Sequence, residues 1–496
     1  MLSAPTVNSA QMRAAEEAAF ARGATAEGLM DEAAAGIARC VSHFFPNPGR
    51  CIVFAGKGNN AGDAFAAAQL LHDRGWHIEL RLWFPEAESN ALAAQKLRSL
   101  RDVLDTARPA AASRKSPNVV LDGLLGLGGK LPLRDPILTA CREINALRQE
   151  QNAFVFAIDL PTGLDSDSGE ADEHCVVSDF TVTIGYAKRG LIADSALEHV
   201  GRIEVAPLHE LRHSIGTPEA QVATAASLRH LLPRRSFSGY KNQFGRVGVV
   251  AGSRGLTGAA VLCALGAMRG GAGLLRAYVL EEVYPIIAAS APPEAMIQPV
   301  SSYASLLDEN VDVWAVGPGL GHAHAADILR LVEASPKPMV IDADGLNILS
   351  KGIDVLTRAA GPRLLTPHPG EMKRLLRGDN MSRAETAAAF CAQYPQATIL
   401  LKGSRSMIAE HGRPSSYNTT GNAGMSTGGM GDALTGVCAA LLAQKLSAYD
   451  AARLGAWLCG RAADIALFSG SVSEQSLLPR DVIEHLGAAF HDLQAS

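Results

Sequence analysis

A glycine-rich turn, one carboxylate and a helix start stand side by side in Gly421-Asn422-Ala423-Gly424-Met425-Ser426-Thr427-Gly428-Gly429-Met430-Gly431-Asp432-Ala433-Leu434-Thr435-Gly436. Gly428, Gly429 and Gly431 lack the Cβ atoms that would keep backbone amides away from an anion. The apolar run 433–442 predicts a helix whose N-terminus faces the turn, and helix N-termini attract phosphate groups. The stretch therefore predicts a site that handles phosphate.

Asp432 is the one ionisable side chain in this stretch. Because a bare carboxylate would repel phosphate, we interpret Asp432 as a base. It would take a proton from a hydroxyl while that oxygen attacks a phosphoryl group. The alternative is an ordinary helix N-cap. The neighbouring glycines favour the catalytic interpretation, because such flexible residues weaken a chain segment that holds no ligand.

Length and composition indicate a soluble α/β enzyme with two domains. The chain has 496 residues, of which 47% are apolar and 48 are glycine, and its formal net charge is −5. Such a length exceeds that of one typical domain. Lysine and arginine form only short clusters, at 97–101 and 233–235, so we expect no nucleic-acid partner.

The eight cysteines include no Cys-x-x-Cys pair, which favours free thiols in a reducing compartment over zinc or disulfides. Residues 8–17 lack the apolar core of a signal peptide, and no apolar run approaches the roughly 20 residues of a membrane span. We therefore expect a cytoplasmic protein without a membrane partner.

Short apolar runs alternate with amphipathic stretches such as 64–74, which predicts two parallel α/β sheets. The first series of strands comprises 51–54, 78–83, 119–121, 154–158 and 180–184. The second comprises 246–250, 313–316, 339–341, 364–365 and 398–401. A polar segment, 208–239, separates the two series, so we place the boundary near residue 218, giving domains 1–217 and 218–496. The segment 110–117 is predicted to be a loop.

Three carboxylates of the first half follow predicted strands. Asp63 closes the turn Gly56-Lys57-Gly58-Asn59-Asn60-Ala61-Gly62-Asp63, Asp122 follows the strand 119–121, and Asp159 follows the strand 154–158. The carboxyl ends of neighbouring parallel strands meet at one edge of a sheet, where ligands bind. We therefore expect one polar crevice here. Its carboxylates and amides suit sugar hydroxyls, phosphate and a hard cation.

The first half is similar to NAD(P)H-hydrate epimerases in Gln11-Met12-Arg13, the turn 56–63, Asp122 with Gly126-Leu127-Gly128, and Ile158-Asp159-Leu160-Pro161-Thr162-Gly163. The second half resembles ADP-dependent NAD(P)H-hydrate dehydratases of the ribokinase-like fold in 240–246, 251–253, 257–259, 317–321, 342–344, 366–372 and 401–403. The chain thus resembles the family of bifunctional NAD(P)H-hydrate repair enzymes. The resemblance implies a Rossmann-like three-layer sandwich followed by a ribokinase-like one.

This resemblance also implies roles for single residues. In the first half the hydrated nucleotide would contact Asn59, Asn60, Ala61, Gly62, Asp63, Gly126, Leu127, Gly128, Gly129, Lys130, Leu131, Pro132 and Asp159. Potassium would be held by Asn60, Asp122 and Thr162. In the second half the hydrate would contact Ala259, Gly319, His368 and Asp432. The adenine nucleotide would contact Lys402, Gly403, Ser404, Arg405, Ser406 and Gly431.

Two departures from the family pattern occur in the first half. Ala61 and Ala64 stand where glycines are usual, and Thr162 stands where serine is usual. An added methyl group could crowd the approach of a ligand to the backbone, whereas threonine keeps the hydroxyl ligand. A nucleotide-sensing or partner-binding module without catalysis is therefore the alternative for this half.

The implied chemistry of the second half follows from its substrate. Hydroxide is a poor leaving group, so phosphorylation of the hydrate by ADP, with magnesium, would allow elimination to restore the dihydropyridine ring. Asp432 would be the base, the amides of 428–431 would stabilise phosphoryl charge, and Glu371 would position the metal through water. His368 either bonds the substrate or packs at a strand end, and Lys402 either contacts phosphate or is a surface lysine. Gly317-Pro318-Gly319 predicts a rigid turn at which backbone meets a ligand.

For the first half, inversion at the hydrated carbon needs groups that move protons. Asp159 is our acid-base candidate. Lys188 is a weaker one, with a surface lysine as its alternative. For the whole chain, the alternative is a ribokinase-like kinase of a vitamin precursor or sugar. The sequence 368–371 argues against it, because many sugar kinases have asparagine in place of His368. The apolar face 454–458 would pack inside the domain or between the subunits of an expected homo-oligomer.

Overall fold

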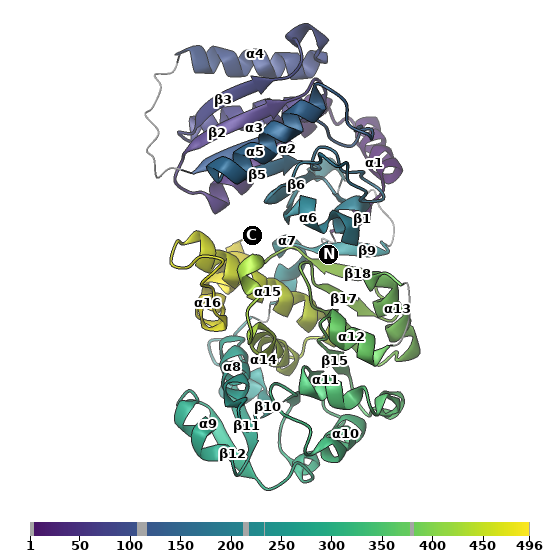
Figure 1. The fold of residues 1–496 in the computed structure, drawn as a ribbon, viewed down its shortest axis with the longest axis vertical. Coiled ribbons are helices and arrows are strands. Elements are labelled where there is room, and N and C mark those ends of the chain that lie inside the picture. The colour runs from purple at the N-terminus through teal and green to yellow at the C-terminus, as the bar shows by residue number, and fades with distance from the viewer. Residues whose placement is uncertain (1–3, 107–116, 212–217, 233, 377–380, 496) are drawn as a thin grey trace. The chain divides into compact units, whose positions relative to one another are not determined.

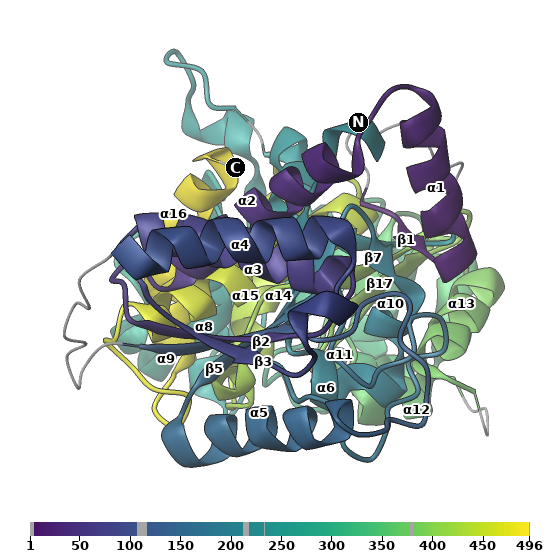
Figure 2. The same cartoon turned by 90° about the horizontal axis from the view of Figure 1, so that it is seen from above.

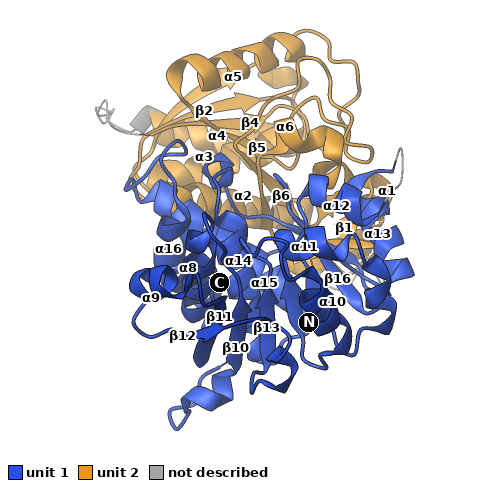
Figure 3. Cartoon of the chain, turned by 60° about the horizontal axis from the view of Figure 1, so that its bottom comes forward, with its two compact units in different colours: residues 1, 223–496 blue, residues 2–222 orange. Residues whose placement is uncertain are grey.

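The computed structural model describes residues 4–106, 117–211, 218–232, 234–376 and 381–495. The chain divides into two compact units, Leu2–Val222 and Ala223–Ser496, which Figure 3 colours separately. Each unit is built from alternating strands and helices around a largely parallel sheet. The predicted two-domain α/β architecture is confirmed.

The N-terminal unit contains, among its described residues, a six-stranded sheet of order β3-β2-β4-β5-β6-β8, all neighbours parallel. Its strands are β2 (Arg50–Ala55), β3 (His77–Leu82), β4 (Asn118–Gly123), β5 (Phe154–Ile158), β6 (Phe180–Ile184) and β8 (Arg202–Ala206). A short parallel pair joins β1 (Thr6–Val7) to β7 (Ala187–Lys188). The inner strands are buried on both faces, which explains their continuous apolar runs.

Helices cover both faces of this sheet. They are α1 (Ser9–Ala21), α2 (Ala26–Phe44), α3 (Asn59–Asp73), α4 (Ala91–Thr106), α5 (Ile137–Gln151) and α6 (Leu197–Val200). Figure 2 shows α2, α3 and α4 on one side of β2 and β3 and α5 on the other. Ile137, Ala140 and Ile144 of α5 pack against Ile52 and Val120 of the sheet. The unit is therefore a three-layer sandwich.

The second sheet, as described, has the order β12-β11-β10-β13-β14-β15-β16-β17-β18-β9. Its strands are β9 (Ala220–Ala223), β10 (Arg246–Val250), β11 (Leu274–Leu280), β12 (Met296–Val300), β13 (Val313–Val316), β14 (Met339–Ile341), β15 (Arg363–Leu365), β16 (Ala397–Leu401), β17 (Met407–Glu410) and β18 (Ser415–Asn418). The neighbours from β12 to β16 are parallel, whereas β16, β17 and β18 are antiparallel.

The helices of this unit lie on both faces of the sheet (Figure 1). They are α7 (Ala225–Leu228), α8 (Thr257–Arg269), α9 (Tyr284–Ser290), α10 (Ala325–Ala334), α11 (Asp344–Leu349), α12 (Pro369–Leu375), α13 (Arg383–Gln393), α14 (Met430–Ala443), α15 (Ala448–Phe468) and α16 (Pro479–Ala495). The apolar core joins α8, α14, α15 and α16 to one face of the sheet.

Helix α14 is buried along most of its length and packs very closely on α8. A Cβ on Gly436 would lie 2.0 Å from Cys263 O, and a Cβ on Gly266 would lie 2.3 Å from Ala433 O. Only glycine permits this approach. The glycines of the sequence 421–436 thus serve helix packing at Gly436 as well as the turn that precedes α14.

Two helices begin earlier than the sequence predicts. Helix α14 begins at Met430 and α3 at Asn59, earlier than the predicted 433 and 64, so residues predicted to form turns make up the first helical turns.

The face 454–458 is buried inside its own unit, so it offers no support for the expected homo-oligomer, which stays a prediction. The predicted loop 110–117 lies outside the described residues except for Pro117, as do 212–217 and Pro233 in the predicted boundary segment. Within the described ranges, no helix is both long and apolar enough to cross a membrane.

Candidate active sites

In the C-terminal unit, polar residues follow three neighbouring strands at one edge of the sheet. Asp342 follows β14, Glu371 lies in α12 after β15, and Lys402 follows β16. Because β14, β15 and β16 are parallel neighbours, their carboxyl ends meet at the same edge. The backbone joins two of these segments directly, since Lys402 N donates to Pro367 O at 2.8 Å.

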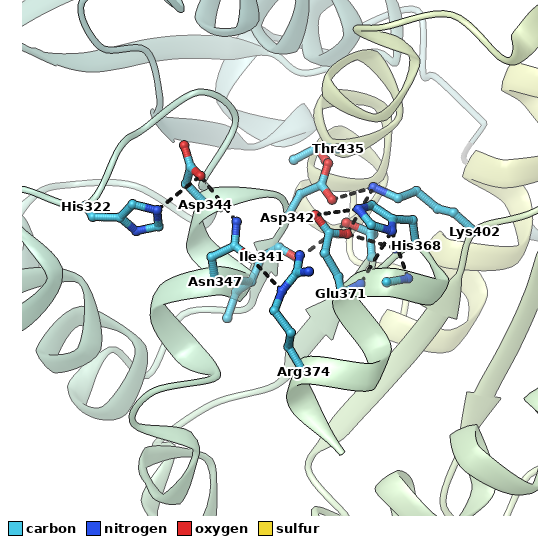
Figure 4. Close-up of polar contacts among 12 residues, drawn as sticks. His322, Ile341, Asp342, Asp344, Asn347, His368, Glu371, Arg374, Lys402 and Thr435 are labelled. Atoms are coloured by element: carbon cyan, nitrogen blue, oxygen red, sulfur yellow. Dashed lines mark hydrogen bonds and ion pairs between the residues drawn. The ribbon is translucent and has the colours of Figure 1, made fainter. Parts of the chain in front are cut away.

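Asp342 is the centre of the polar contacts at this edge (Figure 4). Its Oδ1 accepts from Lys402 Nζ at 2.6 Å, and its Oδ2 accepts from Thr435 Oγ1 at 3.0 Å. Asp342 is 1% exposed. Lys402 is also close to Glu371, with Nζ 4.0 Å from Oε2. Burial opposes the charge on Lys402, but the charge and hydrogen bond of Asp342, together with the charges of Glu371 and Asp432, outweigh burial and raise the pKa of the lysine. The interpretation of Lys402 as a surface lysine is therefore wrong.

Asp432 lies in the first turn of α14, and the N-cap of that helix is Gly429 with φ of 93°. The interpretation of Asp432 as an N-cap is therefore wrong. Burial, with a further contribution from the charge of Asp342, raises the pKa of Asp432 to about 7, against the opposing effect of Lys402. A carboxyl that titrates near neutral pH is suited to act as a general base.

Gly431 lies directly beside the Asp342–Lys402 pair. A Cβ at this position would be 3.1 Å from Asp342 Oδ2 and 3.1 Å from Lys402 Nζ. The predicted nucleotide contacts Lys402, Gly403, Ser404, Arg405 and Ser406 form the connection between β16 and β17. The structure thus brings Gly431 and the start of this connection together. Arg405 is buried, and its carbonyl accepts from Arg383 Nη2 at 2.7 Å.

His368 is the N-cap of α12. Its Nδ1 accepts from Gly370 N at 3.0 Å, and Glu371 Oε2 accepts from His368 N at 2.8 Å. The imidazole is 52% exposed, so it is not packed at the strand end. Because Nδ1 accepts these backbone protons, the ring proton lies on Nε2, which is 3.5 Å from Glu371 Oε1.

Two predicted hydrate contacts, Ala259 and Gly319, are neighbours. Gly319 has φ of 56°, and a Cβ there would lie 2.9 Å from Ala259 Cβ. Gly317 has φ of 123°, and Pro318 O accepts from Gly252 N at 2.9 Å. The sequence 317–319 is therefore the tight turn that was predicted. It follows β13, at the same edge of the sheet as Asp342.

Asp342 and Thr435 received no role from the sequence. Asp342 belongs to the motif 342–344 and Thr435 to the glycine-rich stretch 421–436. Nothing in the order of residues reveals the hydrogen bond between them. Asp344 belongs to a second group, in which its Oδ2 accepts from Gly321 N at 2.9 Å and its Oδ1 from Asn347 Nδ2 at 3.3 Å. His322 Nε2 lies 3.7 Å from Asp344 Oδ1.

The N-terminal unit has a cavity of about 530 Å³ at the carboxyl ends of its strands. The predicted contacts that line it are Asn59, Asn60, Asp63, Gly126, Leu127, Gly128, Gly129 and Asp159. Those that do not line it are Ala61, Gly62, Asp122, Lys130, Leu131, Pro132 and Thr162. Two of the three predicted carboxylates, Asp63 and Asp159, therefore meet in one cavity, whereas Asp122 is fully buried.

Asp159 forms an ion pair with Lys188. Lys188 is 1% exposed and also donates to Ile184 O at 2.9 Å and Thr183 Oγ1 at 3.3 Å. The interpretation of Lys188 as a surface lysine is therefore wrong. Asp159 Oδ1 accepts a hydrogen bond from Lys188 Nζ and another, at 3.1 Å, from Ile184 N. Asp159 has φ of 68°, unusual for a residue with a side chain.

Asp122 and Thr162 form a buried pair beside Asn60. Thr162 donates through Oγ1 to Asp122 Oδ1 at 2.7 Å and through N to Oδ2 at 2.8 Å. Burial raises the pKa of Asp122 to about 6. Asn60 Oδ1 would lie 3.2 Å from a Cβ on Gly126. Its Nδ2 is buried and has no hydrogen-bond partner among the described residues.

Ala61 and Ala64, the two alanines that depart from the family pattern, are fully buried and do not line the cavity. The Ala64 methyl lies only 2.5 Å from where a Cβ on Gly123 would be. It thus packs against the bare backbone of β4, away from the cavity lining. The methyl groups therefore do not crowd a ligand in this cavity.

Comparison with known proteins gives two family matches. Residues 26–190 match the family model of the YjeF-related protein N-terminus, and residues 247–486 match that of NAD(P)H-hydrate dehydratase. The bifunctional NAD(P)H-hydrate repair enzyme Nnr of Moorella thermoacetica is 36% identical over 481 residues, covering 90% of this chain and 88% of that protein. The Nnr of Gloeobacter violaceus is 34% identical, covering 92% and 94%. A crystal structure of the ADP/ATP-dependent NAD(P)H-hydrate dehydratase of Bacillus subtilis is 30% identical, covers 54% of this chain and 97% of its own, and has a TM-score of 0.48.

Proposed function

This chain belongs to the family of bifunctional NAD(P)H-hydrate repair enzymes, and we propose that it restores hydrated NADH and NADPH in two steps. The N-terminal unit interconverts the R and S epimers of the hydrate. The C-terminal unit then dehydrates the S epimer with consumption of ADP, through a phosphorylated intermediate. The observation that carries the second step is the position of Asp432, in the first turn of α14 with a pKa of about 7.

In the C-terminal unit, Asp432 takes the proton from the hydrate hydroxyl as that oxygen attacks the transferred phosphoryl group. The first amides of α14 have no partner inside the helix, so they can stabilise the charge that develops there. Lys402, fixed by Asp342, contacts the phosphates of the nucleotide. Ala259, Gly319 and His368 hold the hydrate. Elimination of the phosphate then restores the dihydropyridine ring.

Magnesium fits this edge of the sheet as an ion shared with the nucleotide. Among the described residues, no group of three or more His, Cys, Asp or Glu side chains could hold a metal. Mg²⁺ commonly relies on one or two carboxylates, water and substrate phosphates rather than on a full protein cage. Glu371, 4.0 Å from Lys402, is the carboxylate that would position it through water. When bound, the ion neutralises charge on the nucleotide oxygens.

In the N-terminal unit, the cavity of about 530 Å³ is large enough for part of a dinucleotide. Asn59, Asp63 and the turn 126–129 hold the hydrate there, and Asp159 is the base. Potassium fits the side chains of Asn60, Asp122 and Thr162, which offer oxygen ligands around one short segment, 124–126. A monovalent cation would offset the buried charge of Asp122.

A kinase of a vitamin precursor or sugar with a non-catalytic N-terminal module is not favoured. Relatives named as bifunctional repair enzymes match nine tenths of the chain, both halves included. The alanines that suggested an inactive first half do not line the cavity. We also propose a cytoplasmic location, because the spacing of the eight cysteines indicates no disulfide framework.

The test is the recovery of dihydronicotinamide absorbance from a mixture of the NADH hydrate epimers, with magnesium, potassium and either ADP or ATP. The intact chain should restore all of the mixture, and Asp432→Asn should restore none. Recovery that stalls at the fraction of one epimer would leave only the dehydratase. If neither nucleotide supported recovery, the repair function would be wrong.

A further inference from the structure

Helix α1 presents one face to the cavity of the N-terminal unit. Met12, Glu16 and Phe20 all line the cavity and are spaced four residues apart. Residues at this spacing share one side of a helix. The Glu16 carboxyl therefore points toward the same space as Asp159 and Lys188, which line the cavity as well.

The start of α1 is fixed by two sets of hydrogen bonds. Asn8 and Gln11 form a reciprocal capping box. Asp167 accepts from Ser9 N at 2.6 Å and from Ser9 Oγ at 2.7 Å, which ties the helix to the segment after Asp159. The position of Glu16 is thus set by a capped helix and not by a loose terminal segment.

Lys188 is an unsuitable proton donor. Its ammonium group donates to Asp159 Oδ1, Thr183 Oγ1 and Ile184 O, which accounts for its three protons. These bonds hold Asp159 with Oδ1 occupied and leave Oδ2 for the base function. The cavity therefore contains a base with its counter-ion, and the acid must be a different group.

Inversion at the hydrated carbon requires both an acid and a base. The base takes the hydroxyl proton, the C–O bond becomes a carbonyl, and the bond from carbon to the ring nitrogen breaks with its electron pair left on nitrogen. That nitrogen then takes a proton from the acid. Closing the ring on the other face reverses each transfer, so no net proton is gained or lost.

We propose that Glu16 is the acid that protonates the ring nitrogen while Asp159 acts as the base, an assignment that rests on the proposed epimerase function. Burial raises the pKa of Glu16 against the opposing effect of Lys188, and Asp159 raises it further. Arg13, on the same helix, lowers it. A glutamate with a raised pKa keeps its proton closer to neutral pH, as an acid catalyst needs.

Asp63 is the other carboxyl that faces this group. Burial, Asp159 and Glu16 raise the pKa of Asp63, against the effect of Lys188. Asp63 is only 8% exposed and lies near the start of α3, among the residues proposed to hold the substrate. Glu16 is the less buried of the two and extends from α1, a second helix that lines the cavity. We therefore assign the proton transfer to Glu16 and substrate contact to Asp63.

The experiment measures interconversion of purified R-NADH hydrate by the full chain, without nucleotide so that no dehydration occurs, using chromatographic separation of the epimers. Glu16→Gln should lower the rate on the order of a hundredfold or more. The affinity of the Glu16→Gln variant for the equilibrium epimer mixture, measured by calorimetry, should be unchanged. An unchanged affinity would also show that the variant is folded. Glu16→Asp should recover part of the rate. Glu17→Gln, an exposed neighbour on α1, should match the unmodified chain.

The outcomes separate the two proposals. A rate unchanged by Glu16→Gln, or a loss seen only with Asp63→Asn, would overturn the assignment of Glu16 and leave the epimerase function standing. Loss of affinity in Glu16→Gln without loss of the maximal rate would also overturn it, because Glu16 would then be a binding residue. If the unmodified chain failed to interconvert the epimers, both proposals would fall.

Discussion

Lys402 Nζ donates a 2.6 Å hydrogen bond to Asp342 Oδ1, and this pair lies directly against Gly431 at the start of α14. One carboxylate thus fixes the lysine proposed to bind phosphate and acts on the proposed base. The second effect is electrostatic, because the charge of Asp342 adds to burial in raising the pKa of Asp432. Binding and basicity are therefore coupled through Asp342.

The pH dependence of dehydration should report this coupling. Asp432 must lose its proton to act, so kcat/KM for the S hydrate should rise with pH through a midpoint near the pKa of about 7. Asp342→Asn removes a negative charge and should move that midpoint to lower pH, while raising KM for ADP because Lys402 loses its anchor. The measurement is the pH profile of both enzymes at saturating magnesium. An unshifted midpoint would contradict the electrostatic role of Asp342.

Gly431→Ala should impair dehydration without unfolding the chain. The new Cβ would lie 3.1 Å from both Asp342 Oδ2 and Lys402 Nζ, so the pair must move. We expect a loss on the order of tenfold to a hundredfold in kcat/KM, the size typical of small displacements in an active site.

The matched control is Gly487→Ala, at an exposed position within α16 where a Cβ meets no atom within 4 Å. Replacing this glycine should leave activity unchanged and stabilise the unit by about 0.5–1 kcal/mol. Full activity of Gly431→Ala beside that control would show that the contact with Asp342 and Lys402 does not constrain catalysis.

Much of the fold could be predicted because the inner strands of parallel sheets are buried on both faces and appear as apolar runs. Phe154–Ile158 and Arg246–Val250 were predicted with their observed bounds. Strand β12 was missed because it is half-exposed and contains Pro299, and β18 was missed because its residues Ser415–Asn418 are mostly polar. The predicted starts of α14 and α3 were too late, because glycine and asparagine, as at Gly431 and Asn60, are typical turn residues. Only the structure shows that the caps Gly429 and Gly58 precede them.

The polar contacts of the two sites could not be predicted in the same way. Lys188 and Lys402 each bury a charge, but their partners, Asp159 and Asp342, lie far away in the sequence. Glu16 left only an ambiguous signal, because its spacing with Met12 is equally typical of an ordinary amphipathic helix. For the two lysines, the order of residues does not reveal which distant carboxylate compensates the buried charge.

Lys188→Met should destabilise the N-terminal unit by about 3–5 kcal/mol, because it leaves the Asp159 charge buried without its partner. Epimerisation should be lost, whereas dehydration of S hydrate by the other unit should persist. The adjacent Arg189 supplies the control, since its pair with Glu219 is 41% and 84% exposed and its removal should cost less than about 1 kcal/mol. Urea unfolding measures both variants. Equal stability of Lys188→Met and Arg189→Met would contradict the buried ion pair.

Potassium should stabilise the N-terminal unit in a pH-dependent manner. Burial raises the pKa of Asp122 to about 6, above the ordinary aspartate value of about 4. The free energy of unfolding therefore falls as the pH rises from about 4 through 6, and the full loss is present at higher pH. A cation held by Asn60, Asp122 and Thr162 would offset this charge. The rise in Tm on replacing choline chloride with KCl at equal ionic strength should therefore be larger at pH 8 than at pH 5. Asp122→Asn should abolish the difference between the salts, and a rise of the same size in that variant would show that potassium binds elsewhere.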